Sequence, residues 1–218
     1  NAANKTGKFL TRYPFDDTDI YKTLEGAAYS LVVRPDRVLE RYVDSLITII
    51  AAAQESDGYL YTSRTINPQQ IHSWSGTERW VNESALSHEL YNSGHLFEAA
   101  AAHFAATGKR NLLEVALKNA DLLTGVFAPG KRTDAPGHEI VEMGLARLYR
   151  ITGERKYLDL AKFFIDCRGK KIDSARTYWQ DHKPVVMQDE AVGHAVRAGY
   201  LYSGVADVAA LTGNEAYI

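Results

Sequence analysis

Four of the seven histidines in this sequence lie near the N-terminal ends of alternate predicted helices. They are His88 and His95 in HELYNSGH, His138 in PGHEIVE, and His194 in EAVGHAVRA. A neutral imidazole donates one hydrogen bond and accepts another, and a carboxylate one helical turn away can fix its tautomer. Both His138 and His194 have a glutamate at that spacing. A single histidine of this kind is often a buried core residue, but the recurrence of the pattern predicts a pocket lined by imidazoles.

Several carboxylates fall in the same parts of the sequence, and paired carboxylates are the groups that most glycosidases use. The candidates are Asp57, Glu139, Glu142, Asp189 and Glu190. The sequence does not give the separation between them, on which that chemistry depends. A carboxylate at the start of a helix also stabilises the helix dipole, and we favour this role for Asp189 and Glu139. No catalytic residue is assigned from this set.

Aromatic residues are frequent in the long segments between the predicted helices. They are Tyr59, Tyr61, Trp74, Trp80, Tyr178 and Trp179. Aromatic rings at the mouth of a pocket can stack on sugar faces, or they can pack the loops onto the helices, and both roles stay open. We expect Tyr59 or Trp74 to lie beside the histidines, and we include both among the candidate sugar-binding residues.

Apolar residues recur at intervals of three and four in seven segments, which is the spacing of amphipathic helices. The predicted helices cover residues 18–33, 36–54, 83–106, 109–125, 138–151, 154–167 and 189–211. Thr-Gly pairs at 107–108, 152–153 and 212–213 separate helices, because glycine readily adopts the left-handed conformation that ends a helix. A Pro-Asp pair at 35–36 has the same role. Residues 214–218 resemble the start of an eighth helix, so we expect residues 1–218 to be part of one domain that continues beyond them.

Short and long connections alternate strictly along the chain, and the long ones cover residues 55–82, 126–137 and 168–188. Stacked helical hairpins therefore place all short turns at one end and all long loops at the other. Helices rich in small residues alternate with helices rich in charge, which predicts an inner and an outer layer. The histidines then gather at the long-loop end of the inner layer. The predicted fold is an incomplete all-α (α/α)6 six-hairpin toroid, which we favour over an open α-solenoid.

The composition excludes several classes of protein and site. With 218 residues, 45% hydrophobic residues and a net charge of −2, the chain gives no reason to expect nucleic acid as a partner. No apolar run approaches the roughly 20 residues that span a bilayer, so no membrane partner is expected. The one cysteine, Cys167, allows no internal disulfide and cannot build a thiolate metal site alone. Phosphate-binding loops, dinucleotide fingerprints, HExxH and GxSxG are absent. Oligomeric state and compartment stay open.

Five segments, taken in order, carry a resemblance that spans nearly the whole chain. They are FDDTDIYKTLEGAAYSL, AQESDGYLYT, HELYNSGHLFEAAAAHFAATGKRNLLEVA, APGHEIVEMGLARLYRITGERKYLDLAKFFIDCRG and QDEAVGHAVRAGYLYSGVADVAALTG. Together they resemble glycoside hydrolase family 127, the β-L-arabinofuranosidase family. The resemblance implies an (α/α)6 catalytic domain followed by β-sandwich domains, and release of terminal β-L-arabinofuranose from plant-type glycans. It also implies a zinc-bound cysteine nucleophile, held with further cysteines and a glutamate, and a second glutamate as acid/base.

The resemblance transfers sugar-contacting roles to His88, His138 and His194, with His95 as a further member. It transfers neither the zinc ligands nor the catalytic residues, which are expected outside this chain, and Cys167 does not match the nucleophile. We therefore expect residues 1–218 alone to be inactive and to bind no catalytic zinc. Two alternatives remain from the residues themselves: another six-hairpin sugar enzyme, such as an unsaturated glucuronyl hydrolase or a sugar epimerase, and a non-catalytic helical-repeat scaffold.

Overall fold

The computed structural model describes residues 2–9 and 12–218, which form an all-helical chain. The α-helices are α1 (Asp17–Val33), α2 (Arg37–Ala53), α3 (Thr62–Thr65), α4 (Glu89–Thr107), α5 (Asn111–Val126), α6 (Val141–Thr152), α7 (Arg155–Cys167) and α8 (Ala195–Thr212). The seven predicted helices are all present, and the four-residue α3 is an addition to them. Short 3-10 helices lie at Ser73–Ser75, Ser174–Trp179, Val185–Met187 and Glu215–Tyr217. Extended pairing within the described ranges is limited to one isolated bridge between Phe127 and Arg132.

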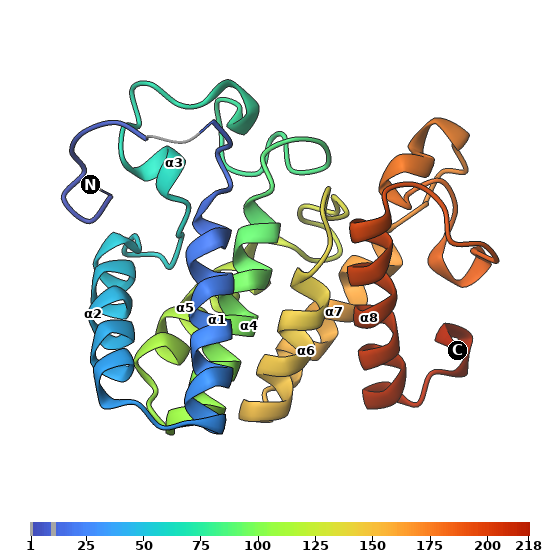
Figure 1. Ribbon diagram of the computed structural model, residues 1–218. Helices are drawn as coiled ribbons and strands as arrows, with labels where there is room; N and C mark the ends of the chain where they lie inside the picture. Colours follow the sequence, from blue (N-terminus) through green and yellow to red (C-terminus); the bar gives the residue numbers. More distant parts are fainter. Residues whose placement is uncertain (1, 10–11) are drawn as a thin grey trace.

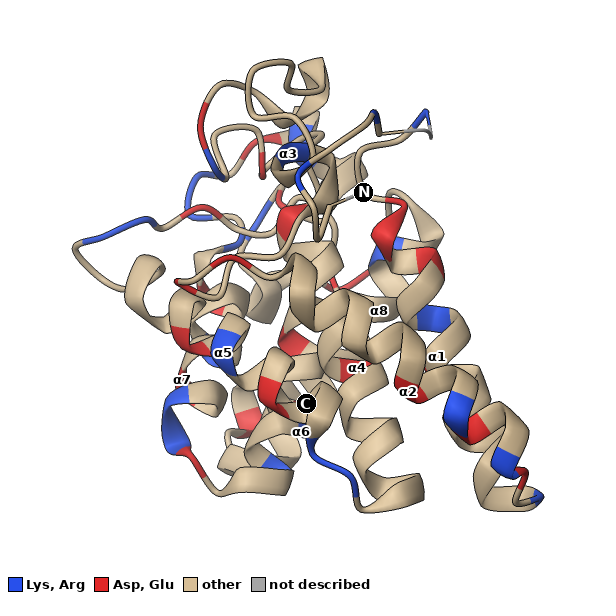
Figure 2. Cartoon of the chain, turned by 90° about the vertical axis from the view of Figure 1, so that its left-hand side faces the viewer, with Lys and Arg blue, Asp and Glu red and all other residues tan. Residues whose placement is uncertain are grey.

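The long helices form two layers, as the alternating connections predict. Helices α1, α4, α6 and α8 stand side by side in one row, with α5 and α7 behind them and α2 at one side (Figure 1). The long loops gather at one end of both layers and the short turns at the other (Figures 1 and 2). Charged residues of both signs occur along α2, α5 and α7 (Figure 2). This arrangement is an arc of an α/α toroid, with the row of α1, α4, α6 and α8 on its inner side.

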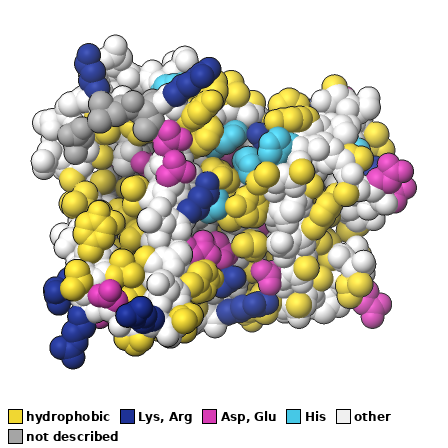
Figure 3. Space-filling model, viewed as in Figure 1, with side chains coloured by type: hydrophobic (Ala, Val, Ile, Leu, Met, Phe, Trp, Pro, Cys, Tyr) yellow, Lys and Arg dark blue, Asp and Glu magenta, His cyan; other side chains and the backbone are white. Residues whose placement is uncertain are grey.

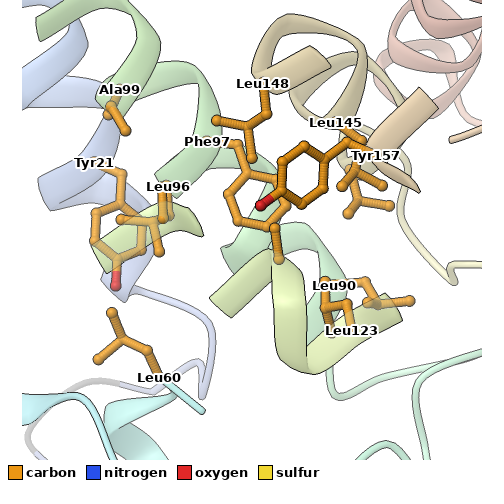
Figure 4. Packing of buried hydrophobic residues seen from close by; sticks show 14 of the residues in the cluster. Tyr21, Leu60, Leu90, Leu96, Phe97, Ala99, Leu123, Leu145, Leu148 and Tyr157 are labelled. Carbon is orange, nitrogen blue, oxygen red and sulfur yellow. The ribbon is translucent and has the colours of Figure 1, made fainter. Parts of the chain in front are cut away.

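Helix α4 is the centre of the core, since every residue from Glu89 to His103 is buried. Phe97 of α4 is completely buried and packs towards Leu145 and Leu148 of α6 (Figure 4). Small residues allow the two helices to approach closely. A Cβ added at Gly94 would lie 2.6 Å from the backbone nitrogen of Val141, so that a larger side chain there would force α4 and α6 apart. Within the described residues, no helix combines the length and the apolar character needed to cross a membrane.

The three Thr-Gly turns share one set of hydrogen bonds, which confirms the prediction from their sequences. In the middle turn, Gly153 has a left-handed φ of 74° and its N–H donates to the carbonyl oxygen of Tyr149. The hydroxyl of Thr152 donates to the Leu148 carbonyl at 2.8 Å and accepts from the Glu154 N–H at 3.1 Å. The turns at residues 107–109 and 212–214 repeat these contacts. Each turn thereby satisfies one free carbonyl at the end of one helix and starts the next.

Three inner helices begin later than the sequence pattern predicts, at residues 89, 141 and 195 instead of 83, 138 and 189. The backbone explains two of these differences directly. His88 has a left-handed φ of 57°, and Ile140 has a φ of 133°, so neither residue can continue a helix towards the N-terminus. His88 and His194 are instead the N-cap residues of α4 and α8. The histidines therefore project from the ends of the inner helices and not from their first turns.

Candidate functional site

The three histidines at the ends of the inner helices come together in the structure, as predicted. The ring centroids of His88 and His138 are 5.5 Å apart, and those of His138 and His194 are 6.0 Å apart. Histidine side chains can be seen gathered near the long-loop ends of the front helices (Figure 3). His88 and His138 are nearly buried, and His194 is half-buried. We call His88, His138 and His194 the histidine rim.

Two tyrosines that the sequence analysis missed fill the space beneath the histidine rim. The ring of Tyr91 lies 4.3 Å from that of His138 and 4.6 Å from that of His95. Tyr200 of α8 lies 5.6 Å from His95 and 6.0 Å from His138. Tyr91 follows His88 by three residues, a spacing that places both on one side of α4 and could have identified it. His95 is thus joined to the rim through aromatic contacts, and it lies deeper in the molecule.

Hydrogen bonds to the backbone fix which nitrogen of His138 and of His194 carries the proton. Nδ1 of His138 lies 3.1 Å from the Glu139 carbonyl oxygen, which only accepts, so Nδ1–H donates and Nε2 is left as an acceptor. Nδ1 of His194 accepts from the backbone N–H of Arg197 at 3.4 Å, so its proton is on Nε2. The two rings together offer one acceptor and one donor. A hydroxyl group needs one of each.

Burial keeps the imidazoles of His88 and His138 neutral over a wide pH range. It lowers the pKa of His88 and of His138 to about 3, and the nearby guanidinium of Arg197 acts in the same direction. The pKa of His95 is lowered to about 3 by burial and by the charge of Lys22. A neutral histidine binds hydroxyl groups without the desolvation cost of a charge. The neutral imidazoles of His88 and His138 therefore suit the hydroxyl groups of a ligand.

The two aromatic candidates have different positions relative to the rim. Trp74 is half-buried and packs on Tyr13, whose ring stacks on Phe15, and Phe15 in turn stacks on His88 at 4.5 Å. Trp74 thus lies at the margin of the site. The ring of Tyr59 is 2% exposed, and its hydroxyl donates to a carboxylate oxygen of Glu89 at 2.5 Å. In this structure Tyr59 holds its loop against the first turn of α4.

Four of the five candidate carboxylates pair with cations. Asp57 is exposed and pairs with Arg79 at 2.5 Å, and exposed Asp189 pairs with Lys183. Glu139 and Glu142 are completely buried and pair with a single buried arginine. Glu190 is exposed at the surface.

A second pair of buried acids, which sequence reasoning missed, lies at the start of α4. Glu83 accepts hydrogen bonds from the backbone N–H groups of Glu89 and Leu90, at 2.7 and 3.2 Å. Glu89 accepts from the Trp80 N–H at 2.9 Å and from the Ser87 hydroxyl at 2.8 Å. Burial, reinforced by the charge of Glu89, raises the pKa of Glu83 to about 8. These contacts cap the helix that carries His88.

The residues that could bind zinc do not form a site here. Across residues 2–9 and 12–218, no three or more His, Cys, Asp or Glu side chains are arranged to hold a metal ion. Cys167 is buried at the end of α7, and burial raises the pKa of its thiol, so it is not a thiolate poised for metal binding. The histidine rim is joined by tyrosine rings and not by further ligands.

All of residues 1–218 match the family model described as β-L-arabinofuranosidase, GH127 catalytic domain. The chain belongs to this family. A non-reducing end β-L-arabinofuranosidase of Bifidobacterium longum subsp. longum is 42% identical over an alignment 228 positions long, which covers 94% of this chain and 34% of that protein.

Solved structures of GH127 proteins share the fold of this chain. A GH127 β-arabinofuranosidase superposes with a TM-score of 0.92 at 55% identity, over 99% of this chain and 34% of that one. The GH127 β-L-arabinofuranosidase of Geobacillus stearothermophilus T6 gives a TM-score of 0.90 at 39% identity, over 99% of this chain and 36% of that one. The GH127 chain described here thus spans about a third of the length of these relatives. Its all-helical arc corresponds to part of their catalytic α/α domain.

Proposed function

We propose that this GH127 chain is part of a glycoside hydrolase that releases terminal β-L-arabinofuranose from plant-type glycans. The observation that carries the proposal is the convergence of His88, His138 and His194 at the long-loop end of the inner helices. It is supported by the family of the chain, whose relative from Bifidobacterium is named a non-reducing end β-L-arabinofuranosidase. In this proposal the chain supplies sugar-binding groups to an active site that is completed by other parts of the protein.

The geometry of the rim supports binding of a neutral sugar. His138 offers an acceptor and His194 a donor, and their ring centroids are 6.0 Å apart. The buried ring of Tyr91 and the half-buried ring of Phe15 pack against His88 and give the site an apolar wall. Apolar walls with a few convergent polar groups are typical of small-molecule sites. We propose His88, His138 and His194 as direct sugar contacts, His95 as a deeper member and Trp74 as a contact at the margin.

Bond cleavage requires groups that we do not assign within residues 1–218. We propose that the whole protein uses zinc, as the family resemblance implies, and that its ligands, the nucleophile and the acid/base residue lie outside this chain. The rim histidines then bind sugar and not metal. This division of roles makes a direct prediction for substitutions at the rim.

The test compares the full-length protein with its His194→Ala variant. Release of an aryl group from an aryl β-L-arabinofuranoside is measured together with zinc content by atomic emission. We expect activity and zinc in the wild type, and in the variant a lower kcat/KM with unchanged zinc. Residues 1–218 alone should show neither activity nor stoichiometric zinc.

Three results would contradict the proposal in distinct ways. Loss of zinc in His194→Ala would show that the histidine rim binds metal and not sugar. If the full-length protein is inactive on β-L-arabinofuranosides but hydrolyses or epimerises another sugar, the fold stands and the proposed substrate is wrong. Absence of activity on any glycoside would favour the scaffold alternative.

A further inference from the structure

A buried arginine at the end of α7 joins the two loops that carry His138 and His194. The side chain of Arg168 is 0% exposed. Its Nη2 donates to the carbonyl oxygen of Pro136 at 2.7 Å, and its Nη1 donates to that of Trp179 at 3.0 Å. Pro136 lies two residues before His138, and Trp179 lies in the loop that leads to His194. One guanidinium group therefore bridges the backbones of both loops.

The same guanidinium pairs with two carboxylates at the start of α6. Nη1 lies 3.0 Å from Oε1 of Glu139, and Nη2 lies 3.4 Å from Oε1 of Glu142, with all three side chains completely buried. Burial raises the pKa of Glu139 to about 8, and the charge of Arg168 opposes that shift. Buried ion pairs recover little net stability after desolvation. We therefore attribute to the ion pairs of Arg168 a role in fixing the positions of the two loops, more than a role in overall stability.

In each of the two loops, one or two hydrogen bonds connect the segment that Arg168 holds to a rim histidine, His138 or His194. On one side, the Glu139 carbonyl accepts the Nδ1–H of His138. On the other side, the backbone carbonyl oxygen of Tyr178, the residue before Trp179, accepts a hydrogen bond from the backbone N–H of His194 at 3.2 Å. Gln180, the residue after Trp179, is completely buried and donates to the carbonyl of His194 at 3.2 Å and to that of Val192 at 2.7 Å.

We propose that Arg168 is a positioning residue that sets His138 and His194 at their mutual distance. A guanidinium presents its N–H groups in a rigid plane, so that it can serve two carbonyls and two carboxylates at fixed angles. A lysine at this position keeps the positive charge, but its single ammonium group cannot donate to the carbonyl oxygens of both loops at the angles that the planar guanidinium allows. The kinetic consequence of this role rests on the proposed function of the rim, whereas the structural consequence does not.

The principal test is Arg168→Lys in the full-length protein, with Leu113→Ala as a control for lost stability. Leu113 is completely buried in α5 next to a short turn, at the opposite end from the rim. A crystal structure of Arg168→Lys should show His138 and His194 displaced from their 6.0 Å ring separation. Its kcat/KM on an aryl β-L-arabinofuranoside should fall by about 10–100-fold, the usual effect of losing a supporting contact, mainly through a higher KM. Leu113→Ala should lower Tm and leave KM unchanged.

Two further variants keep the test decisive if Arg168→Lys folds poorly. In Arg168→Ala, added guanidinium ion should restore part of the lost kcat/KM, and it should have no such effect on Leu113→Ala. In Gln180→Met, which leaves Arg168 in place, His194 should shift while His138 stays, and KM should rise.

The proposal is overturned if Arg168→Lys keeps both the ring separation and KM, or if its loss of activity matches that of Leu113→Ala at equal Tm. An unchanged KM in Gln180→Met would remove the link to His194. If the wild type itself does not act on β-L-arabinofuranosides, the proposed function fails. The ring displacement in the Arg168→Lys crystal structure then still decides whether Arg168 positions the rim.

Discussion

Substitution of Glu83 by glutamine should leave the protein stable at pH 6 and make it more stable than the wild type at pH 8. The carboxyl group of Glu83 is 0% exposed, and burial together with Glu89 raises its pKa from 4.5 to about 8. The folded protein therefore holds a proton that the unfolded chain releases above pH 4.5. The contribution of Glu83 to the free energy of unfolding falls as pH rises from about 4.5 towards 8, because in this range the unfolded state binds fewer protons than the folded state.

The size of the effect follows from the two pKa values. Each unit of difference corresponds to about 1.4 kcal/mol. Between pH 6 and pH 8 the wild type should lose about 2 kcal/mol through Glu83, with the slope flattening near pH 8. Glutamine has the shape of the protonated acid and can still accept from the Glu89 and Leu90 N–H groups, so the variant avoids this loss.

The free energy of unfolding is measured by urea denaturation of the full-length protein and the variant at both pH values. Glu114→Gln is the control, because Glu114 is an exposed carboxylate paired with Arg110. We expect Glu83→Gln to gain about 2 kcal/mol on the wild type between pH 6 and pH 8, and Glu114→Gln to gain nothing. An equal destabilisation by Glu83→Gln at both pH values would refute the reasoning, since it would show that Glu83 caps α4 as an anion.

Three other results are expected. The wild-type protein should be most stable between about pH 6 and 7. As pH falls below about 6.5, the unfolded chain takes up protons that the buried His88, His95 and His138 do not, and these three groups outweigh Glu83. As pH rises further, Glu83 retains a proton that the unfolded chain has released, which also favours unfolding; a Tm series over pH would contradict this by rising from pH 6.5 to 8. Gly153→Ala should lower stability by about 1–2 kcal/mol through its left-handed φ of 74° alone, because a Cβ there has open space. Gly26→Ala in the interior of α1, also with open space, should be neutral or stabilising; equal effects would be inconsistent with a conformational cause. Tyr59→Phe should lower Tm by removing the bond to Glu89 and leave KM for the sugar unchanged, and a raised KM with unchanged Tm would return Tyr59 to the binding site.

The features that the sequence predicts correctly are those set by local chemistry. A Thr-Gly pair ends a helix because glycine takes a left-handed φ and the threonine hydroxyl binds both neighbouring turns, and all three pairs do so in the structure. The two layers follow from the alternation of short and long connections. The convergence of the histidine rim follows from the parallel direction of the inner helices, which places equivalent positions at one end.

The features that the sequence does not predict depend on contacts between distant segments. Helix α4 begins at residue 89 because His88 adopts a left-handed φ and stacks on Phe15, which lies 73 residues earlier in the sequence. Arg168 meets Glu139 and Glu142 from the end of the other helix of their hairpin, 26 residues after Glu142, and no local pattern marks this pairing. Tyr59 looks like a loop aromatic in the sequence, yet its hydroxyl has a buried partner that only the fold reveals.

A crystal structure of the full-length protein with L-arabinofuranose bound is the most direct test of the central claim, which is that the histidine rim binds the sugar. We predict a sugar hydroxyl within hydrogen-bond distance of both His138 Nε2 and His194 Nε2, with the former accepting and the latter donating, and the ring of the sugar close to His88. A sugar bound elsewhere, with the three imidazoles making no contact to it, would contradict the account.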